Sequence, residues 1–338
     1  MDALPLDLSH PSVQFYLALV RLQVLTPLSL LLNIASLLIC AILAQPSIPY
    51  LLHSHPTALT PNAHAIAVYV MAVWIAQIGY CVLLVTARKE ETKKAMVSAV
   101  GMALVGANCV MALWAIAFIM QWFLISTVLQ GIILLLLLFS NIALLIYHPP
   151  SSSRPLDTAL IHAPIRFFFV LPLHILFPMS LFVALNLRYP QNIPVPSPPS
   201  TFPFSALVAH SGRTPALFVV LGTNLFGLLI VALRRDIVYA VAATWCAISL
   251  WTAEYPKPSG VYITSITFTA LYPLVLILSM VYHHFYQAPR QNRIALPGDE
   301  RALGRSSTDT SVPPGYEARG NAQGMQAGPR EVEEENWG

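Results

Sequence analysis

The sequence has little charge. Charged residues make up 10% of its 338 residues, whereas hydrophobic residues make up 56%. A soluble domain carries about a quarter charged residues, so this chain has too few to cover a water-exposed surface. The composition therefore excludes an ordinary soluble domain, and the long apolar runs are typical of a multi-pass membrane protein. The net charge of +3 gives no indication of a nucleic-acid partner.

Cysteines and catalytic motifs are also scarce. The four cysteines all lie in apolar runs, where cysteine behaves as a small hydrophobic residue, so neither a disulfide framework nor a Cys-x-x-Cys metal site is indicated. The chain contains no P-loop, Gly-x-Ser-x-Gly or His-Glu-x-x-His motif. We therefore expect no enzyme activity and no cofactor.

The apolar runs predict an all-α fold, a polytopic bundle of about eight transmembrane helices. A helix needs about 20 apolar residues to cross a hydrocarbon core of about 30 Å. The almost uncharged run from Ala95 to Tyr147 would measure about 80 Å as one helix, so it must fold back near Met120–Trp122. The shortest predicted span is the seventh, and a re-entrant helix there would reverse the sidedness of everything after it. The predicted spans are residues 24–43, 65–87, 95–118, 123–147, 167–187, 216–233, 237–251 and 261–282.

Basic residues divide unevenly between the two sides of this arrangement. Fourteen lysines and arginines fall on the side of the N-terminus, the 88–94 loop, the 148–166 segment, the 234–235 turn and the tail, against three on the other side. Cytoplasmic loops are enriched in lysine and arginine, so both termini are predicted to be cytoplasmic. The chain then divides into a membrane domain, residues 1–287, and a polar tail, residues 288–338, whose composition is typical of disorder.

Strong hydrogen-bonding side chains are few within the predicted spans. No Asp, Glu or Lys lies in the middle of a span, which argues against a proton-coupled carrier that relies on a buried carboxylate. Buried amides commonly hold helices together, at about 0.6 kcal/mol each. The alternative is that some of them line a pathway for a polar solute. These side chains are Asn33, Gln77, Asn108, Gln130, Asn141, His174 and Asn224.

The strongest candidate for such a pathway is His174, in the sequence LPLHILFP between Pro172 and Pro178. Each proline removes a backbone donor and kinks the helix, which frees carbonyl groups for a ligand. We therefore predict a polar intramembrane site among His174, Asn108 and Asn224, of the kind that broken helices form in transporters. The alternative is a neutral histidine that is hydrogen-bonded to a neighbouring helix.

Charged residues and histidines near the ends of the spans are predicted to have local roles. In the 234–236 turn, two arginines close one helix and Asp236 caps the next. Arg166 is expected to extend from the start of the fifth span toward the membrane surface. The His53-Ser54-His55 sequence would bind a metal only if a third ligand converged on it, and no cysteine or carboxylate is near, so no metal site is predicted.

The tail contains a Pro-Pro-Gly-Tyr sequence, which has the PPxY form of ligands for WW domains. WW domains occur in ubiquitin ligases that act on membrane proteins, so a WW-domain ubiquitin ligase is a candidate partner. A chance match in a proline-rich chain is the alternative. The docking residues would be Pro313, Pro314 and Tyr316. The tail has no lysine, so the candidate ubiquitin acceptors on its side of the membrane are Lys89, Lys93 and Lys94. The alternative is that these lysines serve only to set the topology of the spans.

Two segments, LDTALIHAPIRFFFVLPLHILFP and RRDIVYAVAATWCAISLW, resemble segments of a family of uncharacterised multi-pass membrane proteins of filamentous fungi. The likeness covers most of residues 60–285 and excludes the tail. The family has no assigned activity, so the resemblance implies an architecture and no function.

Two functions fit these features. One is a carrier or channel for a neutral or lipid-like solute, regulated through the cytoplasmic tail. The other is a membrane adaptor or scaffold that recruits a WW-domain ubiquitin ligase, with the spans as its anchor. Eight spans exceed what an anchor needs, so the carrier is the preferred hypothesis.

Overall fold

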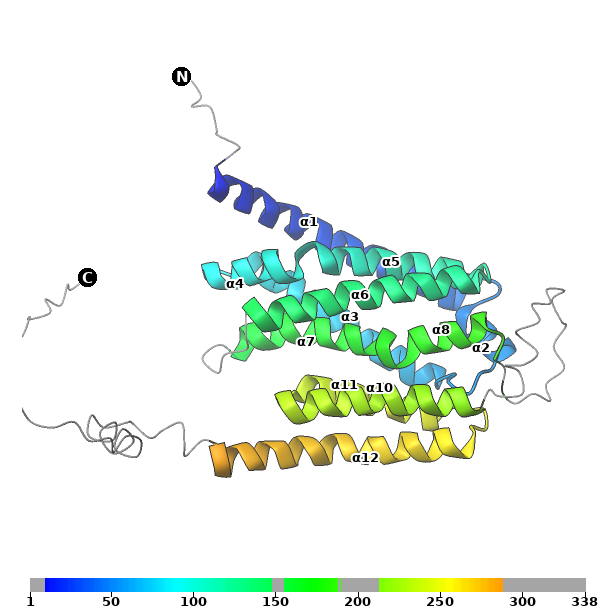
Figure 1. Cartoon of the computed structure of the whole chain (residues 1–338). Coiled ribbons are helices and arrows are strands. Elements are labelled where there is room, and N and C mark those ends of the chain that lie inside the picture. The colour runs from blue at the N-terminus through cyan, green and yellow to red at the C-terminus, as the bar shows by residue number, and fades with distance from the viewer. Residues whose placement is uncertain (1–9, 148–154, 188, 190–212, 288–338) are drawn as a thin grey trace, which may run out of the picture. The chain divides into compact units, whose positions relative to one another are not determined.

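The protein is a multi-pass integral membrane protein built from α-helices (Figure 1). Its structure, a computed structural model, describes residues 10–147, 155–187, 189 and 213–287. Within these ranges seven helices are long and apolar enough to cross a bilayer, and Ile237–Trp251 is a shorter apolar helix. The predicted all-α membrane fold is confirmed.

The spans contain α-helices that four π-helical turns extend or join. The turns are η1 (Ile39–Leu43) after α1, η2 (Met96–Val100) between α4 and α5, η3 (Pro172–Leu176) between α7 and α8, and η4 (His283–Gln287) after α12. The predicted turn near Met120–Trp122 is present, and Gln121 there has a φ of 59°. The α-helices are α1 (Pro11–Leu38), α2 (Ile48–Ser54), α3 (Ala63–Thr86), α4 (Glu90–Ala95), α5 (Gly101–Ile119), α6 (Phe123–Tyr147), α7 (Pro155–Leu171), α8 (Phe177–Ala184), α10 (Arg213–Arg234), α11 (Ile237–Trp251) and α12 (Ser259–Tyr282).

Helix α1 begins well before the predicted first span. It starts at Pro11 instead of near residue 24, because His10 caps it and proline is favoured in the first turn of a helix. The Nδ1 atom of His10 accepts a hydrogen bond from the backbone N–H of Ser12, at 3.4 Å. Arg21, which the sequence places at the edge of the span, is exposed on this longer helix.

The fifth span also begins earlier than the sequence predicts. Helices α7 and α8 and the π-helical turn between them form one run with the span Ala159–Ala184, whereas the apolar run alone predicts residues 167–187. His162 and Arg166 therefore lie inside the span, and His162 is only 5% exposed. The side chain of Arg166 is paired with Asp236, and its depth relative to the membrane surface stays a prediction.

The charged segment between the second and third spans is mostly helical. Residues Glu90–Ala95 form α4, so the predicted loop is reduced to residues 87–89. The first turn of α4 carries two glutamates and its last turn carries two lysines. Acidic side chains stabilise the start of a helix and basic side chains its end, which explains why this polar segment continues the helix of the third span.

Helix α11 has only 15 residues and reaches one end of the bundle. It begins after the turn at Asp236, and Ser249 in its last turn accepts a hydrogen bond from the backbone N–H of Asn62, directly before α3 (2.7 Å). Helix α3 runs antiparallel to it with 24 residues and is thus about 14 Å longer. The turn at Asp236 is therefore recessed, and Figure 1 shows that α10 and α11 stop short of the C-terminal end of α12.

The loops that the sequence places on one side of the membrane meet at one end of the bundle. The backbone N–H of Tyr189 donates to the carbonyl of Pro56 (2.9 Å), and the side chain of Asn62 donates to the carbonyl of Thr252 (2.9 Å). Loops 44–62 and 252–258 are thus joined at this end. Which end faces the cytoplasm stays a prediction.

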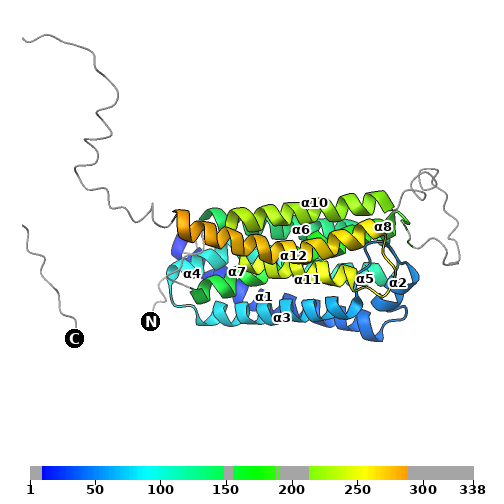
Figure 2. The same ribbon diagram turned by 90° about the horizontal axis from the view of Figure 1, so that it is seen from below.

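The spans pack in two groups. Helices α1, α3, α5, α6, α7 and α8 form one group, and α10, α11 and α12 form the other, with α11 packed against α12, α3 and α7. Figure 2 shows α10 and α12 on the side of the bundle that lies away from α3. Helix α11 thus lies where the two groups meet, and the polar residues of interest surround it.

Candidate functional site

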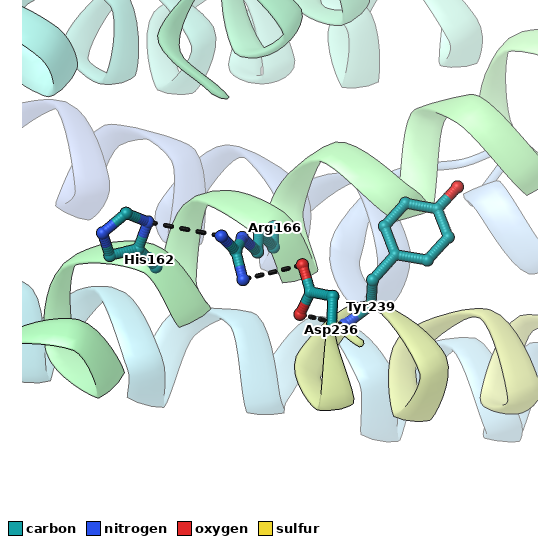
Figure 3. Close-up of polar contacts among 4 residues, drawn as sticks. All are labelled: His162, Arg166, Asp236 and Tyr239. Atoms are coloured by element: carbon teal, nitrogen blue, oxygen red, sulfur yellow. Dashed lines mark hydrogen bonds and ion pairs between the residues drawn. The ribbon is translucent and has the colours of Figure 1, made fainter. Parts of the chain in front are cut away.

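An ion pair joins α7 to the start of α11 inside the bundle (Figure 3). The Nη1 atom of Arg166 lies 2.7 Å from Oδ2 of Asp236, and the two side chains are 12% and 5% exposed. The Nη2 atom of Arg166 lies 3.5 Å from Nδ1 of His162, one turn earlier on α7. Charges are costly inside a bilayer, so a charge pair that is kept there is a candidate for function.

The start of α11 places Asp236 in this pair. Its Oδ1 atom accepts a hydrogen bond from the backbone N–H of Tyr239 (3.1 Å), so the predicted helix cap is confirmed. The second carboxylate oxygen is then available for Arg166. Because α11 is short, the pair lies about 10 Å inside the Ala159–Ala184 span, at the depth of Arg166.

His174 lies in a π-helical turn of the same span. The turn η3 covers Pro172–Leu176, and Pro178 lies in the first turn of α8. The helix irregularity that the two prolines predict is therefore present, and π-helical turns of this kind are frequent at functional sites. The Nε2 atom of His174 lies 3.1 Å from Oη of Tyr239, and the histidine is 6% exposed. Helices α7–α8 and α11 are thus joined twice, by the ion pair and by this hydrogen bond.

A second polar pair joins α10 to α12 beside the first. The hydroxyl group of Tyr272 donates to Asn224, with its oxygen 3.1 Å from both the backbone carbonyl and Oδ1. A Cβ atom on Gly227 would lie 2.6 Å from Oη of Tyr272 and 3.0 Å from Oη of Tyr239. Two hydroxyl groups therefore approach the same point on α10, and they fit there only because residue 227 is a glycine. His174 and Asn224 each bind one of these hydroxyl groups.

Asn108 belongs to a different network. Its Oδ1 atom accepts from Nδ2 of Asn33 (2.8 Å), and its Nδ2 atom donates to Oε1 of Gln77 (2.8 Å), so one amide chain crosses α1, α5 and α3. All three side chains are buried. The structure therefore brings His174 and Asn224 together through two tyrosines and does not bring Asn108 to them. Its contacts are those of a residue that holds helices together.

The candidate acceptor lysines are among the described residues, and the predicted tail motif is not. Pro313, Pro314 and Tyr316 are outside the described residues. Lys89 directly precedes α4 and is exposed, while Lys93 is partly buried and Lys94 is exposed in its last turn. The structure thus describes the three lysines, while their role as ubiquitin acceptors and the docking motif stay predictions.

Tyr239 and Tyr272 were not among the residues predicted for the site. Tyrosines usually concentrate at the two membrane surfaces, whereas Tyr272 lies in the middle of α12 (Ser259–Tyr282). A buried tyrosine hydroxyl needs a hydrogen-bond partner, so its mid-span position was a usable signal. The pairing of Arg166 with Asp236 had no such signal, because it depends on the depth of α11.

Side chains of loop 252–258 close the opposite end of the bundle. The Nζ atom of Lys257 donates to the carbonyl of Thr60, and Oη of Tyr255 is hydrogen-bonded to Nδ1 of His53. Desolvation lowers the pKa of Lys257 from 10.5 to about 7. Desolvation, and then the charge of Glu254, raise the pKa of Tyr255. These contacts tie the loop before α12 to the loop before α3.

No family model, curated protein or solved structure matches this chain. The resemblance to fungal membrane proteins is therefore supported only as far as the class, a multi-pass helical membrane protein. Any function has to be inferred from the geometry of the site.

Proposed function

We propose that the protein is a carrier for a small neutral solute with hydrogen-bonding groups. The observation that carries the proposal is the approach of the His174–Tyr239 and Tyr272–Asn224 pairs to one point at Gly227. Hydrogen-bonding groups in a membrane exchange partners at low net cost, because the alternative partner is another polar group. A solute with hydroxyl or amide groups would offer such partners. The π-helical turn at His174 supports the same role, since interrupted helices form the solute sites of many transporters.

The charge of the site favours a neutral solute. Arg166 and Asp236 compensate each other at 2.7 Å, and the groups around Gly227 are an imidazole, an amide and two hydroxyls. A charged solute would need an opposite charge in the site, because an uncompensated charge is costly to desolvate.

The two closures at the ends of α11 support alternating access. Asp236 pairs with Arg166 at the recessed end, and Ser249 and Thr252 accept hydrogen bonds from Asn62 at the other end. Opening the ion pair would expose the site from one side, and releasing Asn62 would expose it from the other. Carriers need two such closures on either side of one site.

Solute uptake into vesicles tests the proposal. The full chain is reconstituted into phosphatidylcholine vesicles, and the entry of radiolabelled glycerol, urea and glucose is compared with that into empty vesicles. We expect faster entry of at least one of these solutes, and loss of that entry in Gly227→Ala, whose methyl group would displace the two tyrosine hydroxyls of the site. The matched control is Gly222→Ala, on the same helix, because a Cβ atom there has no neighbour within 4 Å. Entry no faster than into empty vesicles for all three solutes, or equal loss in both variants, would overturn the proposal.

Regulation through the tail belongs to the same proposal. The support is the sequence alone: the docking residues Pro313, Pro314 and Tyr316 in a polar tail, and a group of lysines at α4. A WW-domain ubiquitin ligase bound to the tail would adjust the amount of carrier in the membrane. In the adaptor hypothesis the tail binds the same ligase, but the ligase then ubiquitinates other membrane proteins.

A further inference from the structure

A groove opens on the bundle surface between α1 and α6, away from the carrier site. Its volume is about 710 Å³, in the range of about 300–1,000 Å³ that is usual for small-molecule sites. Figure 1 shows the cause, since the N-terminal part of α1 diverges from α4 and α6. The groove is bounded by Phe15 on α1, by Lys94 on α4 and by one face of α6.

The lining of the groove changes from polar to apolar along its length. Lys94 and Tyr147 lie at the end where α4 begins and α6 ends, the position of a membrane surface in this fold. From Tyr147 the wall continues along α6 through Ile146 and Ile142 to Phe139, a rise of about 12 Å. Among the described residues that line the groove, only Lys94 is charged.

We propose that this groove binds one anionic phospholipid, with its phosphate at Lys94 and an acyl chain along α6. A single cation at the membrane surface above an apolar wall is complementary to an anionic headgroup above a hydrocarbon chain. Basic pockets between transmembrane helices bind anionic headgroups in this way. The apolar residues Phe139 and Ile142 are 65% and 45% exposed, so a chain enters the groove directly from the bilayer. The site shares no residue with the carrier site, so either proposal stands without the other.

Native mass spectrometry tests the proposal. The full chain is released from nanodiscs of phosphatidylcholine and phosphatidylserine in equal parts, and the lipids that remain bound are counted. We expect one phosphatidylserine to be retained on the wild-type protein and on Lys93→Ala, the matched control from the same helix, because Lys93 does not line the groove. In Lys94→Ala its occupancy should fall about fivefold, the change that corresponds to about 1 kcal/mol for one lysine near a membrane surface.

A second variant tests the acyl-chain half of the site. Ile142→Trp fills the groove from an exposed position, so we expect it to displace the phospholipid while the helical content by circular dichroism stays unchanged. Equal losses of phosphatidylserine in Lys93→Ala and Lys94→Ala would show only a diffuse attraction between basic side chains and anionic lipids. Retention of phosphatidylcholine equal to that of phosphatidylserine would show only a nonspecific layer of lipid around the protein. If phosphatidylserine binds only after residues 2–9 are removed, that segment and not a lipid is the ligand of the groove in the full chain. Each of these three results would overturn the proposal.

Discussion

Arg166 and Asp236 form an ion pair inside the bundle, with Nη1 and Oδ2 2.7 Å apart, although they lie on different spans. The pair exists because α11 is short, so that its capping carboxylate lies at the depth of an arginine well inside the preceding span. The same two helices are joined again by His174 and Tyr239. Two side-chain contacts therefore hold α11 against this span, and the ion pair is the one at the recessed end.

Asp236→Asn tests the ion pair without removing the helix cap. Asparagine caps helices as well as aspartate does, so the variant keeps the bond to the N–H of Tyr239 and removes only the charge. Arg166 would then be a buried charge without its partner, and we expect a loss of about 3–5 kcal/mol in the free energy of unfolding. The measurement is denaturant unfolding in detergent. In the double variant Arg166→Gln/Asp236→Asn part of the loss should be recovered, and a single-variant loss below about 1 kcal/mol would show a solvent-screened pair.

Tyr239→Phe separates the function of the His174 contact from its contribution to stability. The variant removes the hydroxyl group that lies 3.1 Å from Nε2 of His174 and keeps the ring. The control is Tyr69→Phe, which removes a buried hydroxyl on α3 that is bonded to the carbonyl of Phe167 on α7 (2.8 Å). We expect both variants to lose about 1–3 kcal/mol in the free energy of unfolding and only Tyr239→Phe to lose solute uptake. Equal uptake in the two variants would assign Tyr239 a purely structural role.

Gly227→Ala is expected to destabilise the protein as well as block uptake. Its Cβ atom would lie 2.6 Å from Oη of Tyr272, so that the two tyrosines or α10 have to move. Overpacking of this kind costs about 1–3 kcal/mol. Gly222→Ala on the same helix should cost nothing, because a Cβ atom there has no neighbour within 4 Å. The measurement is the thermal unfolding midpoint of each variant in the same detergent. Equal midpoints would mean that the two tyrosines or α10 move aside at little cost.

The end of the bundle that Lys257 closes should become more stable as the pH rises. Desolvation lowers the pKa of Lys257 to about 7 in the folded protein, against 10.5 when it is exposed. Between pH 7 and pH 10.5 the unfolded chain binds more protons than the folded chain, so the free energy of unfolding rises with pH. Below pH 7 the buried lysine is charged in both states, and the folded state then bears the full desolvation cost.

The measurement for Lys257 is the thermal midpoint as a function of pH. Lys257→Met keeps most of the side-chain volume and removes the titrating group, so the difference between wild type and this variant isolates the lysine. We expect the wild type to approach or exceed the variant as the pH rises from 7 to 10.5. A difference that does not change with pH would show that Lys257 keeps its ordinary pKa.

Tyr316→Ala tests the tail. If the PPxY motif recruits a ubiquitin ligase, quantitative membrane proteomics should show less ubiquitin on Lys89, Lys93 and Lys94 and a longer lifetime of this protein alone. Pro329→Ala changes the same tail outside the motif and serves as the control. Accumulation of other membrane proteins would identify an adaptor instead. If neither this protein nor other membrane proteins change in ubiquitination or lifetime, the PPxY motif is a chance match.

The sequence predicts the spans well and the site only in part. The fourth and seventh predicted spans coincide with α6 (Phe123–Tyr147) and α11 (Ile237–Trp251), because hydrophobicity along a single helix is a local property. Polar residues at the ends were assigned to loops, so α1 and α7 begin earlier than predicted. A helix tolerates such residues when a cap or a partner satisfies them, and neither can be seen in a hydrophobicity profile.

The selection of His174 also followed from a local feature, the two flanking prolines. The contacts between polar residues could not be predicted from local features. Residues far apart in the chain come together only when each helix has a particular depth and rotation within the bundle. The hydrogen bond between His174 and Tyr239 spans 65 positions, and the same packing separates Asn108 from them. Local hydrophobicity thus determines that this chain crosses a membrane repeatedly, and the packing of a 15-residue helix against longer neighbours determines where its buried charges and hydroxyl groups converge.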